Sequence, residues 1–520
     1  MVETFHAPGA ERLANAGTRK AYEALIEHAR EASLLGGTAS LLGWDQETGM
    51  PRLAAAHRGK QRAQLARLVH EMRTDARVDG WLATCEADPA CTADPTAVAA
   101  VNVREIRRDY DRSRKLPTSL VEALARASSA GLEAWKAARA CSEFPQFVPA
   151  LEQILALNRD KAACLGWPAD GEPWDALADS YEPGITAREV DRVFGELAPR
   201  LVSLVGRIAA TGRQPATVDL AAPVEVQRRF VAKVIGHFGF DFDRGRLDIS
   251  THPFCSGSHP SDVRLTTRFR EEDASDALGS TLHECGHGLY EQGLLEEHNG
   301  TPMGSAISLG IHESQSRMWE NQVGRSRAFW TWCAPVAGEM LGKGAKAIDP
   351  EAAYRAANRV EPSFIRVEAD EATYNLHILL RFGLERALIK GDLAAKDLPA
   401  AWNERFERSL GLAVPDDARG CLQDIHWAMS LFGYFPTYTL GNLYAAQLYD
   451  QAKTELPGLE DDFAHGQFAR LRRWLAEKVH AHGKRYGAGE LCRRVTGRPV
   501  SAGPLLGYLE GKLVPLYGLG

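Results

Sequence analysis

The sequence lacks long apolar runs, basic tracts and paired cysteines. No stretch of its 520 residues is long and apolar enough to span a bilayer, and the first residues have neither the basic start nor the apolar core of a signal peptide. A formal net charge of −7 argues against a nucleic-acid or membrane partner. Nine cysteines, scattered from Cys85 to Cys492, suit reduced thiols better than a disulfide framework. We therefore expect a cytoplasmic protein.

The composition is that of an ordinary globular protein, with 45% hydrophobic and 25% charged residues. On length alone the chain could hold three domains, but no linker or change of composition forces a division. We predict one domain over residues 1–520. Residues 1–17, rich in small and polar side chains, are expected to be a loose leader.

Apolar residues recur at spacings of three and four over most of the chain, which predicts a mainly α-helical fold. The pattern begins at Thr18, and Gly43-Trp44-Asp45 is expected to break the first helix. Residues 95–140 predict an antiparallel helix pair. Further helices are expected over 274–292 and 307–323, among others, and over 421–430.

Two short segments alternate in the period of two that is typical of strands. They are residues 246–251 and 262–269, joined by a loop that contains Gly, Ser and Pro. We predict a small antiparallel sheet there. Because it directly precedes the helix at 274–292, we expect an edge strand beside a cleft, available to an extended peptide.

That helix contains His283-Glu284-Cys285-Gly286-His287, an H-E-x-x-H sequence. His283 and His287 are one turn apart on one face, where two imidazoles can bind one metal ion. Glu284, which is not a ligand in this pattern, can take a proton from a metal-activated water and pass it to a leaving amine. The alternative is an amphipathic helix in which these residues coincide by chance.

The third metal ligand must lie further along the chain. The extended form of the motif fails, because Tyr290 and Gly293 stand where its glycine and third histidine belong. Glu313, which is 26 residues after His287 on a separate predicted helix, is our candidate. Four other acids remain open from spacing alone: Glu291, Glu296, Glu297 and Glu320.

Six short motifs occur in one order along the chain. They are His252-Pro253-Phe254, Asp262-Val263-Arg264-Leu265-Thr266, His283-Glu284-Cys285-Gly286-His287, His312-Glu313-Ser314-Gln315, Ile365-Arg366-Val367-Glu368-Ala369-Asp370 and Gly420-Cys421-Leu422-Gln423-Asp424-Ile425-His426-Trp427. In these motifs the chain resembles the carboxypeptidase Taq-type metallocarboxypeptidases, and weaker similarity covers nearly its whole length. It departs at Cys255, where relatives commonly have threonine.

The resemblance implies that His283, His287 and Glu313 hold the metal and that Glu284 is the general base. It implies zinc as the default metal, with cobalt serving in some relatives. It also implies a large helical metallopeptidase with a deep substrate groove, commonly a homodimer.

A carboxypeptidase must bind a free C-terminal carboxylate, for which the planar, two-pronged guanidinium of arginine is suited. Arg366 precedes Glu368 and Asp370, so from the sequence alone it is more readily a structural ion pair. The resemblance places its motif at the cleft and makes Arg366 the candidate carboxylate clamp. Arg264 is the second candidate, with an exposed strand arginine as the alternative.

Further candidates come from the last motif and the loop after it. His426 beside Trp427 is typical of a core histidine, but the resemblance favours a role in the cleft, donating to the oxyanion or to the substrate carboxylate. Tyr434 and Tyr438 are alternative oxyanion donors, with Tyr434 preferred. His252 is either a subsite donor or an anchor for its loop.

These observations predict a zinc metallocarboxypeptidase that releases single C-terminal residues, with broad specificity, from peptides with a free C-terminus. Two alternatives remain: an endopeptidase or dipeptidyl-type exopeptidase on the same scaffold, and a non-catalytic protein that retains a metal site. The presence of Glu284 argues against the second alternative.

Overall fold

The computed structural model describes residues 7–519. Residues 1–6 of the expected leader lie outside the described part of the chain. The rest of that segment is packed rather than loose, because Ala7, Ala10 and Leu13 are buried. The nine cysteines are all free thiols. Among the described residues, no helix has the length and apolar character needed to cross a bilayer.

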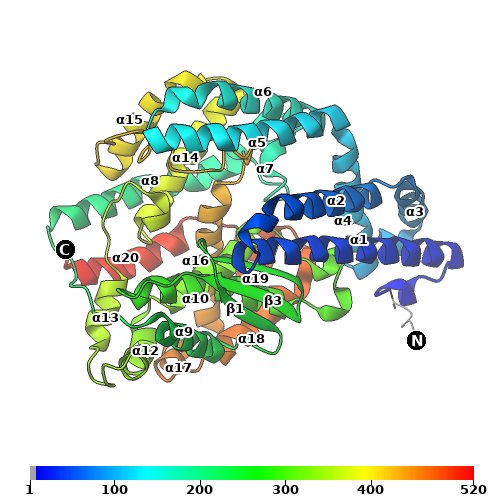
Figure 1. The fold of residues 1–520 in the computed structure, drawn as a ribbon. Coiled ribbons are helices and arrows are strands. Elements are labelled where there is room, and N and C mark those ends of the chain that lie inside the picture. Colours follow the sequence, from blue (N-terminus) through cyan, green and yellow to red (C-terminus); the bar gives the residue numbers. More distant parts are fainter. Residues whose placement is uncertain (1–6, 520) are drawn as a thin grey trace.

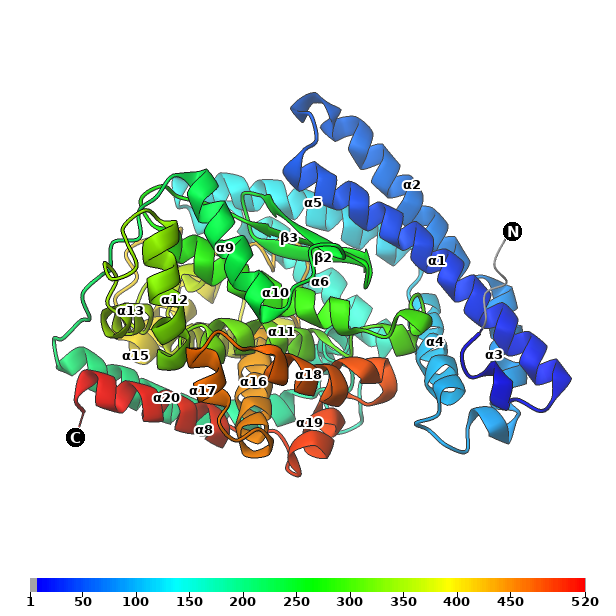
Figure 2. The same cartoon turned by 90° about the horizontal axis from the view of Figure 1, so that it is seen from below.

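The first four helices lie together, and the first, third and fourth share a hydrophobic cluster that is separate from the main core; the second has no buried residue. The four helices are α1 (Ala16–Thr48), α2 (Ala55–Arg73), α3 (Ala76–Glu86) and α4 (Val98–Lys115). The α1–α2 hairpin projects from the rest of the molecule (Figure 2).

The break predicted at Gly43-Trp44-Asp45 is wrong, because α1 continues to Thr48. Tertiary contacts override the local signal there. Arg58 on α2 donates to the Leu42 carbonyl and to Asp45, and the guanidinium of Arg264 lies 4.5 Å above the Trp44 ring.

A second group of helices lies on one side of the body, with α5 and α6 side by side (Figure 1). The group comprises α5 (Thr118–Cys141), α6 (Val148–Leu165), α7 (Pro173–Ala178), α8 (Ala187–Ala210), α14 (Thr373–Lys390) and α15 (Leu398–Leu410). Helices α4 and α5 confirm two helices in residues 95–140, but the predicted antiparallel pairing is wrong, because α4 packs against α3 and α5 packs against α6.

The remaining helices build the body of the molecule, and two of the six motifs lie on them. They are α9 (Val224–Phe238), α10 (Ala274–Gly293), α11 (Leu309–Arg317), α12 (Arg327–Met340), α13 (Pro350–Ala357), α16 (Pro436–Glu455), α17 (Leu459–Ala464), α18 (Ala469–Lys478), α19 (Ala488–Thr496) and α20 (Gly503–Tyr517). The helix predicted over 421–430 is wrong: the segment is a series of turns, and Ser430 has a positive φ of 63°. Apolar spacing alone cannot separate a helix from buried turns.

The sheet has three strands in the order β1-β3-β2: β1 (Gly245–Ile249), β2 (Phe254–His259) and β3 (Asp262–Thr267). The antiparallel pairing predicted for the outer segments is wrong, because β1 pairs with β3 in parallel. The predicted loop contains β2, which forms the antiparallel hairpin with β3. A chain that reverses twice between β1 and β3 brings them together in the same direction.

Helix α10 packs against this sheet on one side and against α11 on the other. The contact with α11 is closest at Gly286, where a Cβ would lie 2.5 Å from the Gln315 carbonyl oxygen and from Cα of Ser316. On the far side of α11, a Cβ at Gly441 of α16 would lie 2.4 Å from Cγ of Glu313. Two glycines therefore set how closely the three helices approach.

We predict that Gly286→Ala forces α10 and α11 apart and lowers the free energy of unfolding by about 1–3 kcal/mol. Gly279→Ala is the matched control, because no atom lies within 4 Å of a Cβ at this site on the same helix. The control should be neutral or stabilising by up to about 1 kcal/mol. Thermal denaturation of both variants tests this, and equal melting temperatures would contradict it.

Candidate metal centre and active site

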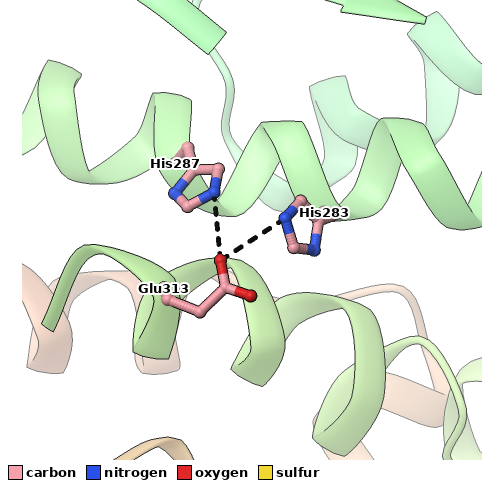
Figure 3. Close-up of side chains that lie close together, drawn as sticks. All are labelled: His283, His287 and Glu313. Carbon is pink, nitrogen blue, oxygen red and sulfur yellow. Dashed lines mark ion pairs between the residues drawn. The ribbon is translucent and has the colours of Figure 1, made fainter. Parts of the chain in front are cut away.

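Two adjacent helices present the proposed metal ligands. Helix α10 begins at the N-cap Asp273, whose side chain accepts from the Ser275 amide, and it carries His283 and His287 one turn apart. Helix α11 begins at the N-cap Ser308, whose hydroxyl accepts from the Ile311 amide. Figure 3 shows the Glu313 carboxylate facing both imidazoles.

The geometry of these three side chains fits a tetrahedral metal ion. The Nε2 atoms of His283 and His287 lie 3.5 and 3.4 Å from Oε2 of Glu313. One ligand atom from each residue can be chosen so that all lie within 4.8 Å of one another. Ligand bonds of about 2.0–2.2 Å in a tetrahedron place ligand atoms about 3.3–3.6 Å apart. The site therefore has the correct size for zinc or a similar cation.

Without a bound cation, burial and neighbouring charges give the two histidines different protonation states at pH 7. Burial lowers the pKa of His287 to about 4, so this imidazole is neutral at pH 7. Burial also opposes a charge on His283, but the carboxylates of Glu313 and Glu320 outweigh it and raise its pKa to about 9. Glu284, beside the ligands, has a pKa raised to about 7 by burial. A carboxylate with that pKa can both accept and release a proton near neutrality.

The four competing acids do not join this cluster. Glu320 accepts from Nδ1 of His283 at 2.9 Å, on the side of the ring away from Glu313. Glu291 pairs with His312 at 2.8 Å. Glu296 lies 3.7 Å from His259, and Glu297 is outside the three-residue group. Glu313 is the carboxylate that the structure brings to both histidines.

The second oxygen of Glu313 is held by Arg317, which donates to Oε1 at 2.7 Å. Arg317 also donates to Glu320 at 3.2 Å, and Ser316 donates to Oε2 of Glu313 at 2.9 Å. Glu320 lies in a π-helical turn, Met318–Val323, that continues α11. Sequence reasoning missed Arg317, although its spacing of four from Glu313 is the signal that could have identified it.

Arg366 is buried and makes an ion pair, but its partner is Asp424 and not the nearby Glu368 or Asp370. Its Nε donates to Asp424 at 2.9 Å and its Nη1 to the Tyr374 hydroxyl at 3.0 Å. Arg381 binds the other oxygen of Asp424 at 2.6 Å. Two guanidinium groups therefore share one carboxylate. Neither Tyr374 nor Arg381 was anticipated, because both lie in α14, outside the six motifs.

The motif at residues 420–427 contacts Arg366. The ring of His426 packs 4.3 Å from that of Phe435, and its Nε2 is 3.2 Å from the Tyr438 hydroxyl. Burial lowers the pKa of His426 to about 3, so it is a neutral donor or acceptor. The guanidinium of Arg366 lies 5.1 Å from the Tyr438 ring. Tyr434 is half-buried, 5.4 Å from both the His426 and Tyr438 rings.

A continuous series of contacts joins this cluster to the metal ligands. Arg317, bonded to Glu313, lies 4.4 Å from the ring of Tyr374, whose hydroxyl accepts from Arg366. Burial raises the pKa values of Tyr434 and Tyr438, and the nearby charge of Glu313 adds to both shifts. The two clusters are parts of one site.

Two candidates stand apart from these contacts. Arg264 on β3 is partly buried, with its Nε bonded to Asp262 at 2.8 Å and its guanidinium over Trp44. His252 is exposed in the loop between β1 and β2, where its carbonyl accepts from the Ser250 hydroxyl. Arg264 is therefore not the exposed strand arginine that was the alternative from the sequence.

The H-E-x-x-H helix, the glutamate from the next helix and the helical body define a metallopeptidase. The chain belongs to the carboxypeptidase Taq (M32) metallopeptidase family, whose model matches residues 24–513. It is a metallocarboxypeptidase, and the endopeptidase alternative is not favoured.

Several relatives resemble the chain over nearly its whole length. It is 47% identical over 507 residues to thermostable carboxypeptidase 1 of Thermus thermophilus, covering 96% of this chain and 99% of the relative. The M32 carboxypeptidase of Deinococcus radiodurans is 42% identical with a TM-score of 0.91, covering 96% and 100%. Metallocarboxypeptidase 1 of Trypanosoma cruzi is 33% identical with a TM-score of 0.91, covering 95% and 99%.

We predict that Asp424→Asn lowers the free energy of unfolding at pH 7 by about 3–5 kcal/mol, because two buried guanidinium groups lose their shared carboxylate. Burial alone raises the pKa of Asp424, but Arg381 and Arg366 outweigh it and hold the pKa well below its ordinary value. The contribution is therefore complete above the unfolded pKa of about 3.9 and falls as the pH drops below it. The difference in melting temperature between the two proteins should be constant from pH 7 to about pH 4 and should begin to narrow between about pH 4 and pH 3. A difference that does not narrow below about pH 4 would contradict the assignment.

Proposed function

We propose that this metallocarboxypeptidase removes single amino acids from the free C-terminus of peptides, using a metal held by His283, His287 and Glu313. The main support for the proposal is that the Nε2 atoms of both histidines lie 3.4–3.5 Å from one carboxylate oxygen of Glu313. Glu284 lies beside these three residues. The surrounding helices supply a mainly buried setting in which charge interactions are strong.

The divalent cation that this family requires supplies Lewis-acid polarisation of the scissile carbonyl and acidifies a water molecule. Glu284 takes the proton from the attacking water and delivers it to the departing amine. Burial of Glu284 supports that double role, because a desolvated carboxylate favours its protonated form and can hold the proton between the two steps.

Arg366 recognises the substrate's terminal carboxylate. Its Nε and Nη1 are engaged by Asp424 and Tyr374, and within residues 7–519 its Nη2 has no hydrogen-bond partner, which leaves a donor for a ligand. The contacts with Asp424 and Tyr374 hold the guanidinium in a fixed orientation. Arg264 and His252 are weaker candidates for substrate contacts, because no described contact links them to Arg366.

His426 and Tyr434 are proposed to donate hydrogen bonds to the oxyanion that develops at the cleaved carbonyl. Both are close to Tyr438, and the charge of Glu313 acts on both tyrosines. A neutral imidazole and a phenol whose pKa is raised retain their protons at pH 7, as oxyanion donors must. Tyr438 is the alternative to Tyr434.

Zinc is the proposed metal, with cobalt as an alternative, since both suit a site with two imidazoles and a carboxylate. Broad side-chain specificity, a homodimer and a cytoplasmic location complete the proposal. The cytoplasmic location is supported by nine free thiols without a disulfide.

We predict that Glu284→Gln leaves zinc content unchanged and lowers kcat by at least about 10³-fold, because the amide cannot accept the proton of the attacking water. Glu296→Gln, at an exposed acid outside the three-residue group, is the control and should keep full activity. Metal analysis and steady-state kinetics measure both effects. An active Glu284→Gln enzyme would exclude Glu284 as the base.

A matched pair of peptides, one with a free C-terminus and one amidated, tests carboxylate recognition. We expect stepwise loss of single residues from the free peptide only, abolished by a chelator and restored by zinc or cobalt. Arg366→Lys should lower kcat/KM for the free peptide by about 10²-fold, because an ammonium lacks the two-pronged donor face. Mass spectrometry of the products provides the measurement. Equal cleavage of both peptides would retain the metal site and reject Arg366 as the carboxylate clamp.

A further inference from the structure

The Nδ1 atoms of His283 and His287, which face away from Glu313, have different hydrogen-bond partners. Nδ1 of His283 meets the Glu320 carboxylate directly, at 2.9 Å. Nδ1 of His287 is instead hydrogen-bonded to Nδ1 of His312, at 2.6 Å. Nε2 of His312 is in turn hydrogen-bonded to Oε1 of Glu291, at 2.8 Å. A second imidazole therefore stands between His287 and its carboxylate.

Two helices bring the three side chains of this bridge together. Glu291 follows His287 by four residues on α10, so the two side chains share a face of that helix. His312 reaches them from α11, one residue before Glu313. The Tyr290 ring lies 5.1 Å from the His312 ring, and the His287 ring lies 4.6 Å from it. The bridge thus joins the two helices on the side of His287 away from Glu313.

One arrangement of protons satisfies all these contacts. To bind a cation through Nε2, a neutral His287 must carry its proton on Nδ1. That N–H donates to Nδ1 of His312, which must then be the unprotonated nitrogen of its ring. His312 consequently carries its proton on Nε2 and donates it to Glu291. The opposite arrangement would direct the N–H of His287 at the cation.

We propose that His312, backed by Glu291, is a positioning residue that fixes the tautomer and ring orientation of His287 and so raises the affinity of the site for its metal. The inference rests on the ligand set given under the proposed function. Ligand histidines ordinarily donate to a carboxylate, carbonyl or water, and loss of such a partner costs about 10–100-fold in metal affinity. Here the accepting group is another histidine.

The surroundings of His312 make it suitable for substitution. Its side chain is 19% exposed, and it lines a cavity of about 590 Å³ that also borders Tyr181 and Ser308. Replacing the ring therefore leaves the packed core intact.

The test is the dissociation constant for zinc of the full-length apoprotein, measured by competition with a chelating indicator. We expect His312→Leu to weaken zinc binding by about 10–100-fold. His312→Asn should recover most of that loss, because its amide oxygen can take the place of the accepting Nδ1. The release rate of zinc to excess chelator gives an independent reading that needs no turnover.

Two controls distinguish a failure of the proposed His312 role from a failure of the proposed ligand set. His28→Leu removes a buried histidine bonded to the Met72 carbonyl among the first four helices and should leave zinc affinity unchanged. His287→Ala should abolish binding; if it does not, the ligand set fails and the inference falls with it. If His287→Ala abolishes binding but His312→Leu binds zinc as tightly as the unaltered protein, the ligand set stands and the bridge is rejected.

Discussion

The close approach of α10 and α11 at Gly286 is the constraint on which the site depends. A Cβ at this position would lie 2.5 Å from the facing backbone, so only glycine lets the helices meet. That contact brings Glu313 to both histidines and allows His312 of α11 to reach His287 and Glu291 of α10. The sheet supports α10 from the other side, so the helix has little freedom to withdraw.

Buried charge organises the rest of the site. Glu313 and Glu320 share Arg317, and Arg366 and Arg381 share Asp424. Tyr374 lies between these two groups, packed against Arg317 and bonded to Arg366. Each of these side chains has at least one ion-pair partner, as burial requires, although one carboxylate serves two guanidinium groups at Asp424. The proposed chemistry at the metal and the proposed recognition of the carboxylate are therefore built on one connected framework.

Features that depend on local spacing could be predicted from the sequence, whereas contacts between segments far apart in the chain could not. The H-E-x-x-H spacing places His283, Glu284 and His287 on one helix, and the mainly helical class follows from apolar periodicity. Glu313 is preferred over four other acids through resemblance, and the structure brings it to the histidines. The partners of Arg366 come from segments nearly sixty positions away or on another helix, so no spacing indicates them. The parallel pairing of β1 and β3 could not be predicted, because the Gly and Ser residues of β2 are typical of a loop.

The Arg366–Asp424–Arg381 group contains two positive charges and one negative charge, so it retains a surplus of one positive charge in a protein whose formal net charge is −7. If Arg366 binds substrate as proposed, a chain-terminal carboxylate neutralises that surplus as it displaces water. A blocked end, or an internal segment of a chain, displaces the same water without supplying a counter-ion. Discrimination between chain ends and chain interiors then arises from the solvation of a fixed charge, with no need for a steric block beyond the terminal residue.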